Sequence, residues 1–277
     1  MNNNQFLEEI HQYIDDTYHE FEQYQDVSFD ILCEFDSICR RNNIQYFLAY
    51  GTLLGAIRDD GQIPWDYDID VMIKIQDRKK LIEVLKNELG SDYYYAYLDN
   101  TPRYPTYCLR VCKKGYHFNA IHVDVFFLIG CPNKESARIK FLTKRSLYCK
   151  RRLKKNSYFW FCSKNSSFEK LYYYYCLIRG CFIPKFVLNI EEYYITQSFP
   201  LIESDYCCSL AQEMNVFKTE WFEATTEIFI RNRYLPIPTG YKEILECLFG
   251  QFGDYLPVSE RFDEFYKFFR IIKKRNF

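Results

Sequence analysis

Three aspartates alternate with Tyr67 and Ile69 in the segment 66–70, which reads DYDID. In an extended strand, side chains two positions apart lie on the same face, so Asp66, Asp68 and Asp70 would crowd one patch. Three like charges at that spacing repel one another unless a cation lies among them. Oxygen ligands suit Mg²⁺ or Mn²⁺ best, so the pattern predicts a divalent metal site on a strand.

The residues before this strand indicate a phosphate site. Glycine at position 51 lets the backbone approach a ligand closely, and the hydroxyl of Thr52 could donate to a phosphate. We expect a short helix over residues 53–57 whose N-terminus points at this Gly-Thr turn, and helix N-termini favour phosphate. A phosphate site next to a metal site predicts phosphoryl chemistry.

Asp124 is the third metal-ligand candidate, together with Asp68 and Asp70. It lies inside an apolar strand predicted over residues 121–129, where an unpaired carboxylate would be costly to bury. The alternative is that all three are ordinary surface carboxylates on edge strands. Asp66 is either a further ligand or a cap of the turn. His122 shares the face of Asp124 and is a general base, a donor to phosphate, or a satisfied buried histidine.

The run GTLLGAIRDDGQIPWDYDID, residues 51–70, resembles the LicD family and the wider nucleotidyltransferase-fold superfamily. That superfamily has a Gly-Ser/Thr turn, an Asp-x-Asp pair on a strand and a third Asp on a neighbouring strand. Gly51-Thr52, Asp68-Ile69-Asp70 and Asp124 match these features. The run FIRNRYLPIPTGYKEILECLFGQFGDYLP near the C-terminus is also similar to LicD-like chains, so the resemblance covers about residues 27–130 and 215–258.

The sequence departs from the commonest family pattern at three positions. Tyr67 interrupts a run of aspartates, Asp59 follows Arg58 where histidine is frequent, and Phe127 stands where proline is common. No presumed metal ligand is lost, but the identities of donor and acceptor stay open.

The resemblance implies an α/β (α+β) fold with a nucleotidyltransferase-like mixed sheet flanked by helices, a helical insertion and a C-terminal helix–strand portion. It implies a metal-dependent phosphotransferase that moves a phospho-alcohol group, phosphocholine first, from a CDP-linked donor and releases CMP. The acceptor would be a hydroxyl of a surface glycan such as lipopolysaccharide, teichoic acid or capsule. The alternatives are a nucleotidyltransferase that releases pyrophosphate from an NTP, and a catalytically silent glycan-binding member.

Three more residues are candidates for the donor site. Arg58 could meet the transferring phosphate, or form a salt bridge with a neighbouring aspartate. Arg110, on a predicted strand over 106–112, is a weaker candidate of the same kind. Trp65 could hold a quaternary ammonium group through cation–π attraction, or could anchor the packing behind Pro64.

We predict three parts of the chain: a catalytic core at 1–132, a basic and aromatic helical insertion at 133–205, and a C-terminal portion at 206–277 that packs on the core. Helices are expected at 5–24, 27–42, 77–89 and 239–249, with further strands at 68–75, 93–98, 216–222 and 226–231. Residues 138–155 hold nine Lys or Arg and no acid. With the aromatic runs 158–161 and 172–175, they favour an anionic acceptor or membrane surface over a merely solvated face.

Composition and charge indicate which other classes of protein the chain does not resemble. A net charge of −1 gives no general attraction to nucleic acid. The twelve cysteines include no C-x-x-C pair, and residues 1–30 contain no apolar segment typical of a signal peptide. No apolar window is long enough to span a membrane. We therefore predict a cytoplasmic protein with reduced cysteines, peripheral at the inner face of the membrane if residues 138–155 bind lipid.

Overall fold

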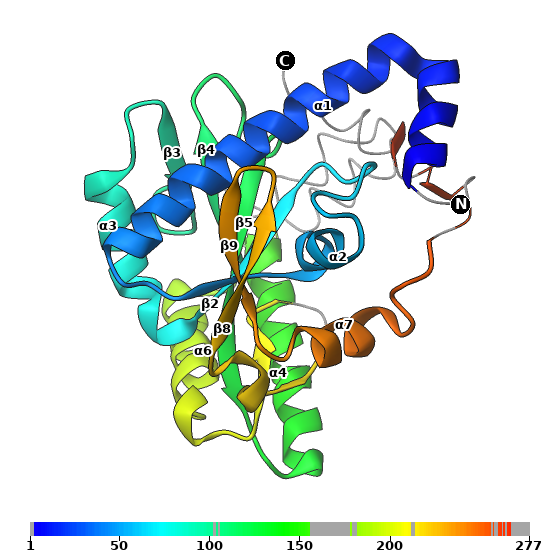
Figure 1. Cartoon of the computed structure of the whole chain (residues 1–277). Coiled ribbons are helices and arrows are strands. Elements are labelled where there is room, and N and C mark those ends of the chain that lie inside the picture. The colour runs from blue at the N-terminus through cyan, green and yellow to red at the C-terminus, as the bar shows by residue number, and fades with distance from the viewer. Residues whose placement is uncertain are drawn as a thin grey trace.

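The computed structural model describes residues 3–155, 178 and 182–266, apart from residues 102, 103, 105, 212, 213, 256, 258, 259, 262 and 264; the side chains of 3–18 and 153–155 are not described. The fold is a mixed α/β fold, which confirms the predicted class (Figure 1). The α-helices are α1 (Asn3–Arg41), α2 (Tyr50–Arg58), α3 (Arg78–Glu88), α4 (Glu135–Lys155), α6 (Lys185–Gln197) and α7 (Tyr241–Phe249). The 3₁₀ turns are η1 (Ile75–Asp77), η3 (Leu201–Glu203) and η4 (Thr219–Phe222).

A twisted sheet forms the centre of the molecule. Its strands are β1 (Tyr46–Leu48), β2 (Ile69–Lys74), β3 (Tyr93–Ala96), β4 (Leu109–Lys113), β5 (His122–Cys131), β6 (Tyr206–Ser209) and β7 (Phe217–Lys218). The order is β1-β2-β5-β4-β3, and β6 pairs with β5 and with β7. Among the described strands, β2 and β5 form the parallel pair, and all other pairs are antiparallel.

Strand β5 organises this sheet because it is long and almost wholly apolar. Its first half pairs with β4 through Leu109↔Val125, and its second half pairs with β6 through Leu128↔Ser209. Nearly every residue of β5 is buried, as expected for a central strand covered on both faces. The strand at 206–209 was not predicted, because four residues with two cysteines give little alternation to detect.

Helix α1 crosses the sheet on the side of β4 and β5 (Figure 1). The apolar face predicted for residues 27–42 is the buried face, with Ile31, Phe35 and Ile38 fully enclosed. The expected break between two N-terminal helices is wrong, since one helix continues from Asn3 to Arg41. The sequence contains no proline or glycine there, and the amide of Gln25 is instead buried against the carbonyl oxygens of Ile63 and Asp66.

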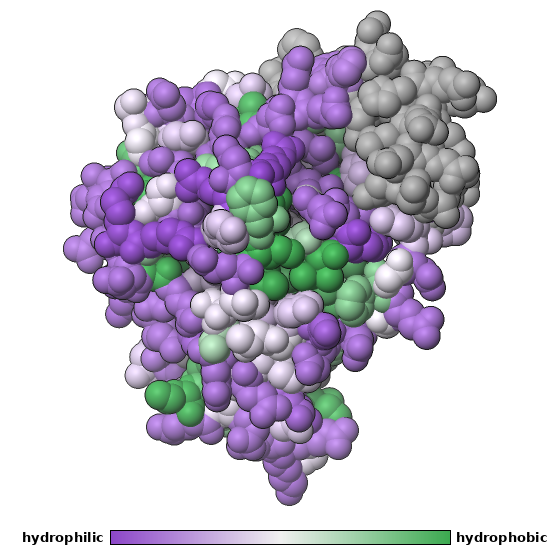
Figure 2. Space-filling model, in the orientation of Figure 1, coloured by the Kyte–Doolittle hydropathy of each residue, from purple (hydrophilic) through white to green (hydrophobic). Residues whose placement is uncertain are grey.

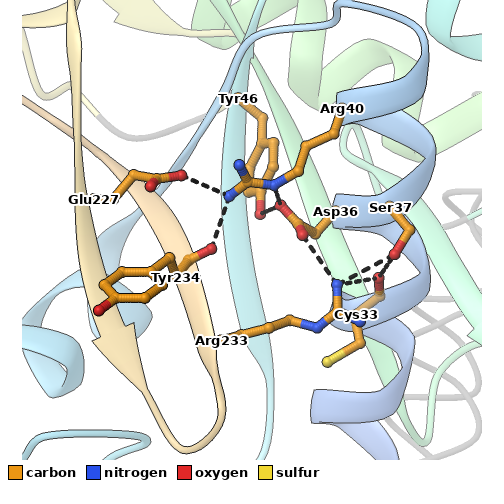
Figure 3. Close-up of polar contacts among 8 residues, drawn as sticks. All are labelled: Cys33, Asp36, Ser37, Arg40, Tyr46, Glu227, Arg233 and Tyr234. Atoms are coloured by element: carbon orange, nitrogen blue, oxygen red, sulfur yellow. Dashed lines mark hydrogen bonds and ion pairs between the residues drawn. The ribbon is translucent and has the colours of Figure 1, made fainter.

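The C-terminal portion returns to the core. The strand expected at 216–222 is only the two-residue β7 followed by η4, whereas β8 (Thr225–Ile230) and β9 (Arg233–Pro238) form a separate hairpin that lies against β1. A polar cluster around the buried Asp36 connects the hairpin to α1 through hydrogen bonds (Figure 3). Its carboxylate accepts from Arg40 at 2.8 Å, from the Tyr46 hydroxyl at 2.8 Å and from Arg233 at 3.1 Å.

Helices α4 and α6 pack on one another beside the sheet, at the lower end of the view in Figure 1. The aromatic runs 158–161 and 172–175 lie outside the described residues. No helix in the described part of the chain is long and apolar enough to cross a membrane. The described cysteines carry free thiols, and most of them are buried.

Candidate active site

Strand register brings the predicted carboxylates together. Asp70 of β2 is directly opposite Asp124 of the parallel strand β5, so the two side chains share one face of the sheet. Asp68 lies just before β2. Asp68, His122 and Asp124 each place one ligand atom within 4.8 Å of the others. This group contains His122 where we expected Asp70.

Arg110 also lies in this cluster. It does not line the cavity beside the carboxylates, which is described below. It is opposite Asp124 across β4 and β5, and its Nε donates to Oδ1 of Asp124 at 2.7 Å. Its Nη1 donates to the side-chain oxygen of Asn119. Arg110 therefore neutralises a ligand candidate in this structure, and its contact with a donor phosphate stays a prediction.

The pKa values of the clustered carboxyl groups shift in different directions. Burial, and then the charge of Asp66, raise the pKa of Asp68 well above its usual value. Burial, and then the charge of Asp68, do the same to the pKa of Asp70. Burial also opposes ionisation of Asp124, but Arg110 and His122 hold the pKa of its carboxyl well below the usual range. Four crowded acids with one arginine leave excess negative charge, which a divalent cation would balance.

His122 is almost completely buried at the edge of this cluster. Neither of its ring nitrogens makes a hydrogen bond within the described residues, and Nε2 lies 3.5 Å from Oδ1 of Asp124. Burial, and then Arg110, lower the pKa of its imidazole, which favours the neutral form. A neutral imidazole beside two carboxylates is a donor set that fits a divalent metal ion. Asp68, His122 and Asp124 would hold it, with Asp70 nearby.

Gly51 and Thr52 lie inside the first turn of α2, because the helix begins at Tyr50 and not at 53 as expected. Tyr50 has a φ of 45°, so the chain enters the helix through a left-handed residue. A methyl group at Gly51 would lie 2.6 Å from Oδ2 of Asp66. The Thr52 hydroxyl accepts from the backbone N–H of Asp70 at 2.8 Å, so it fixes the start of the aspartate strand.

A cavity of about 790 Å³ adjoins the carboxylates. Asp66 and Asp70 line it, as do Gly51 and Arg58. The aromatic part of its wall consists of Tyr50, Trp65, Phe126, Phe249, Phe252 and Tyr255. Hydrophobic residues gather near the middle of the face drawn in Figure 2, where α2 and α7 lie in Figure 1. The site therefore joins an acidic cluster to a mostly aromatic hollow of ligand size.

Arg58 and Trp65 lie together in the wall of this cavity. The guanidinium of Arg58 donates to Oδ2 of Asp59 at 2.9 Å, which is the salt bridge considered as its alternative role. It also lies 4.6 Å from the ring centroid of Tyr255 and 5.7 Å from that of Trp65. Arg261 lies 5.4 Å from the Trp65 ring centroid. Two cations thus already contact these aromatic rings.

Sequence reasoning missed the contribution of the C-terminal segment. Phe249, Phe252 and Tyr255 reach the cavity although they are about two hundred positions from Gly51 in the sequence. The FGDY run at 252–255 was noted only for its resemblance to LicD-like chains. This run was the sequence signal that could have indicated a contribution to the site. Arg261 had no sequence signal, because its place beside Trp65 depends on how the end of the chain packs.

Comparison with known proteins agrees with this geometry. Residues 43–152 match the family model described as "LicD/FKTN/FKRP, nucleotidyltransferase domain". The chain is 24% identical over 260 residues to the lipopolysaccharide cholinephosphotransferase LicD of Haemophilus influenzae, covering 86% of this chain and 92% of that protein. It is 31% identical over 108 residues to an uncharacterised protein of Rickettsia prowazekii, covering 38% of this chain and 35% of that protein.

The matched residues 43–152 contain all four clustered aspartates, Arg58, Arg110 and His122. The similarity to the Haemophilus protein extends well beyond them, over most of both chains. The chain therefore contains a region, residues 43–152, that matches the LicD nucleotidyltransferase-domain model, and this region carries the candidate active site.

Proposed function

We propose that this protein is a phosphotransferase that moves phosphocholine from CDP-choline to a hydroxyl of a lipopolysaccharide-type surface glycan and releases CMP. The observation that carries the proposal is the junction of the acidic cluster with the aromatic cavity, through Asp66 and Asp70. Similarity to a lipopolysaccharide cholinephosphotransferase over most of both chains supports the same reaction.

The aromatic wall of the cavity suits the choline end of such a donor. Quaternary ammonium groups are recognised by aromatic faces, and Tyr50, Phe126 and Phe252 supply such faces in its wall. Trp65, the platform we first considered, already contacts Arg58 and Arg261. The remaining rings are therefore the better candidates for choline.

Asp68, His122 and Asp124 would hold Mg²⁺ or Mn²⁺, which supplies charge neutralisation for a diphosphate when it is bound. The guanidinium of Arg58 would meet a donor phosphate, with Asp59 fixing its orientation. In the transfer, the acceptor oxygen forms a bond to the phosphorus of phosphocholine, and the bond from that phosphorus to CMP breaks. Asp70, which faces the cavity, would take the proton of the acceptor, because a metal-bound imidazole of His122 has no free nitrogen to accept it.

The test is an assay of product identity with purified protein. Radiolabelled CDP-choline, lipopolysaccharide lacking phosphocholine, and Mg²⁺ should give labelled lipopolysaccharide and stoichiometric CMP, with no pyrophosphate. Asp70→Asn should reduce the rate by on the order of a hundredfold or more, since it removes a charge from the reacting site. Asp92→Asn, which changes an exposed carboxylate outside the cavity, is the matched control and should not reduce it.

Two results would overturn the proposal. Pyrophosphate released from CTP with a phospho-alcohol would show a nucleotidyltransferase. Tight glycan binding without turnover of any CDP-alcohol would show a catalytically silent binding protein. CMP release from CDP-ribitol or CDP-glycerol in preference to CDP-choline would keep the reaction class and change the alcohol.

A further inference from the structure

Exposed apolar side chains concentrate on one part of the molecule. Nine of the fourteen large, exposed apolar side chains among the described residues lie between positions 139 and 202. On α6, Phe186, Ile190 and Tyr193 are 65%, 63% and 72% exposed. Their spacing of four and three residues places them in one stripe along the helix. Ile202, in the turn η3 after α6, is 90% exposed.

Helix α4 adds lysines and a second apolar row. Ile139 and Leu147 are about half exposed and lie eight residues apart, and Lys140 and Lys144 are exposed beside them. The ammonium nitrogen of Lys144 lies 5.2 Å from the ring centroid of Tyr194 on α6. The exposed faces of the two helices therefore meet there. Figure 2 shows hydrophobic side chains at the lower end of the molecule, where α4 and α6 lie in Figure 1.

The acids of α6 do not oppose these lysines, because they are paired within the fold. Glu191 pairs with Arg151, and Glu192 lies 2.9 Å from Arg78 and 3.6 Å from Arg152. The other acids of these segments are Glu135, in the first turn of α4, and Glu203, in η3. The surface that remains combines apolar side chains with ammonium groups for which the described part of the chain supplies no ion pair.

This arrangement also changes the sequence-based expectation for residues 138–155. Arg145 is fully buried and donates to the carbonyl oxygen of Ser209. Arg151 and Arg152 are used in the ion pairs with α6. Three of the nine basic residues are therefore used inside the fold, two of them between α4 and α6. We expect the apolar stripe of α6 to contribute to a surface contact in place of these arginines.

We propose that Phe186, Ile190 and Tyr193, with Lys140, Lys144 and Leu147, form a docking surface for an anionic lipid bilayer, here called the α4–α6 surface. Amphipathic helices with aromatic residues on the apolar side and lysines beside them bind the interface of such bilayers. Charge complementarity selects the occupant: the lysine ammonium groups favour anionic headgroups, and each contributes to the attraction near the surface. A second copy of the chain would place lysines opposite lysines if it packed through the same patch.

The experiment is sedimentation of the full chain with vesicles, in metal-free buffer and without donor or acceptor. Its outcome is therefore independent of the transferase assay. Wild-type protein should pellet with vesicles of phosphatidylglycerol and phosphatidylcholine, and much less with phosphatidylcholine alone. Raising the salt to 1 M should weaken binding partly, since screening removes the electrostatic share and leaves the apolar share.

Two sets of variants test the α4–α6 surface. Phe186→Ser with Tyr193→Ser should reduce vesicle affinity by on the order of tenfold or more, while the matched change Phe229→Ser on the exposed hairpin leaves it unchanged. Lys140→Glu with Lys144→Glu should reduce it at least as strongly, whereas Lys79→Glu with Lys114→Glu, which has the same charge change elsewhere, should not.

Wild-type protein that stays in the supernatant with anionic vesicles would overturn the proposal. Equal losses in the test and control variants would do so as well, because the binding would then not depend on the α4–α6 surface. A concentration-dependent dimer in analytical ultracentrifugation that Phe186→Ser dissociates would assign the α4–α6 surface to a second copy instead.

Discussion

The guanidinium of Arg110 and the carboxylate of Asp124 form the closest ion pair of the candidate site, with 2.7 Å between Nε and Oδ1. The pair joins adjacent strands and is nearly buried. In the absence of metal, Arg110 is thus the principal partner of Asp124. A divalent cation at Asp68, His122 and Asp124 would share the same carboxylate.

This pair predicts a metal-dependent rescue. Arg110→Met should destabilise the metal-free protein by about 3 kcal/mol, because it leaves a buried carboxylate without its partner. Mg²⁺ or Mn²⁺ should restore part of that loss by supplying another positive charge. Thermal unfolding with and without EDTA measures both effects. Arg233→Met removes a partner of Asp36 far from the metal candidates, so a metal rescue of that variant would contradict the explanation.

Two glycines of α2 form a matched pair for a second prediction. A methyl group at Gly51 would meet the end of the Asp66 side chain, which can move away. A methyl group at Gly55 would lie 2.6 Å from the carbonyl oxygen of Gly61 and 2.9 Å from the amide nitrogen of Ile63, which cannot move without the backbone.

Gly51→Ala should therefore keep most of the stability but lower transferase activity tenfold or more by displacing Asp66. Gly55→Ala should cost about 2 kcal/mol of unfolding free energy through overpacking. Urea unfolding and steady-state kinetics on the same preparations separate the two. Full activity in Gly51→Ala would show that Asp66 can leave its position without consequence.

The aspartate cluster predicts how stability depends on pH in the metal-free protein. Burial, and then Asp68, raise the pKa of Asp70, so the folded state binds a proton more tightly than the unfolded state. The ionised form costs stability fully above the raised pKa, and this cost disappears as the pH falls toward the unfolded value of about 4. Asp70→Asn should therefore raise the melting temperature at pH 7 to 8 in EDTA.

The advantage of Asp70→Asn should shrink as the pH is lowered toward 5. Asp92→Asn, on an exposed carboxylate, should show no such trend. A melting temperature for Asp70→Asn below that of the wild type at neutral pH would mean that the charge of Asp70 is compensated by groups other than a bound metal.

The polar cluster around Asp36 predicts an effect on stability at a distance from the cavity (Figure 3). Asp36→Asn replaces a charged acceptor of three hydrogen bonds by an amide and should lower the unfolding free energy by about 2 kcal/mol. If the hairpin β8–β9 depends on this polar cluster, the Asp36→Asn change should speed the hydrogen exchange of the hairpin amides more than that of the β5 amides. Unchanged protection of the hairpin would show that its apolar contact with β1 suffices.

Much of the fold could be read from the sequence where the pattern was long. The apolar face of α1 was predicted because burial repeats along it at the helical period, and the strand around Asp124 because its apolar run is nearly continuous. The N-terminus of α2 was misplaced, since Tyr50 takes a left-handed conformation that a tyrosine seldom adopts. β6 was missed because it is short and acquires its hydrogen bonds only from the far half of β5.

The site was predictable in its carboxylates and unpredictable in its cavity. Alternation predicted that Asp68 and Asp70 share one face, and the family resemblance added Asp124 on a neighbouring strand. The structure sets the register that places Asp70 opposite Asp124. The partnership of Arg110 with Asp124 needs the register of β4, and no local pattern specifies it. The contacts of Trp65 with Arg58 and Arg261 depend on tertiary packing of segments far apart in the chain.

The wall of the cavity is drawn from residues 50–70, Phe126, and then residues 215–257. A chain still being synthesised would carry the whole aspartate cluster long before Phe252 and Tyr255 exist. During that interval the crowded acids would face water without the aromatic wall, where cations are plentiful and the donor has nothing to bind. Under the proposed function, donor recognition would thus be the last property this polypeptide acquires, and a C-terminally shortened chain would keep the metal-ligand candidates but lack the aromatic wall.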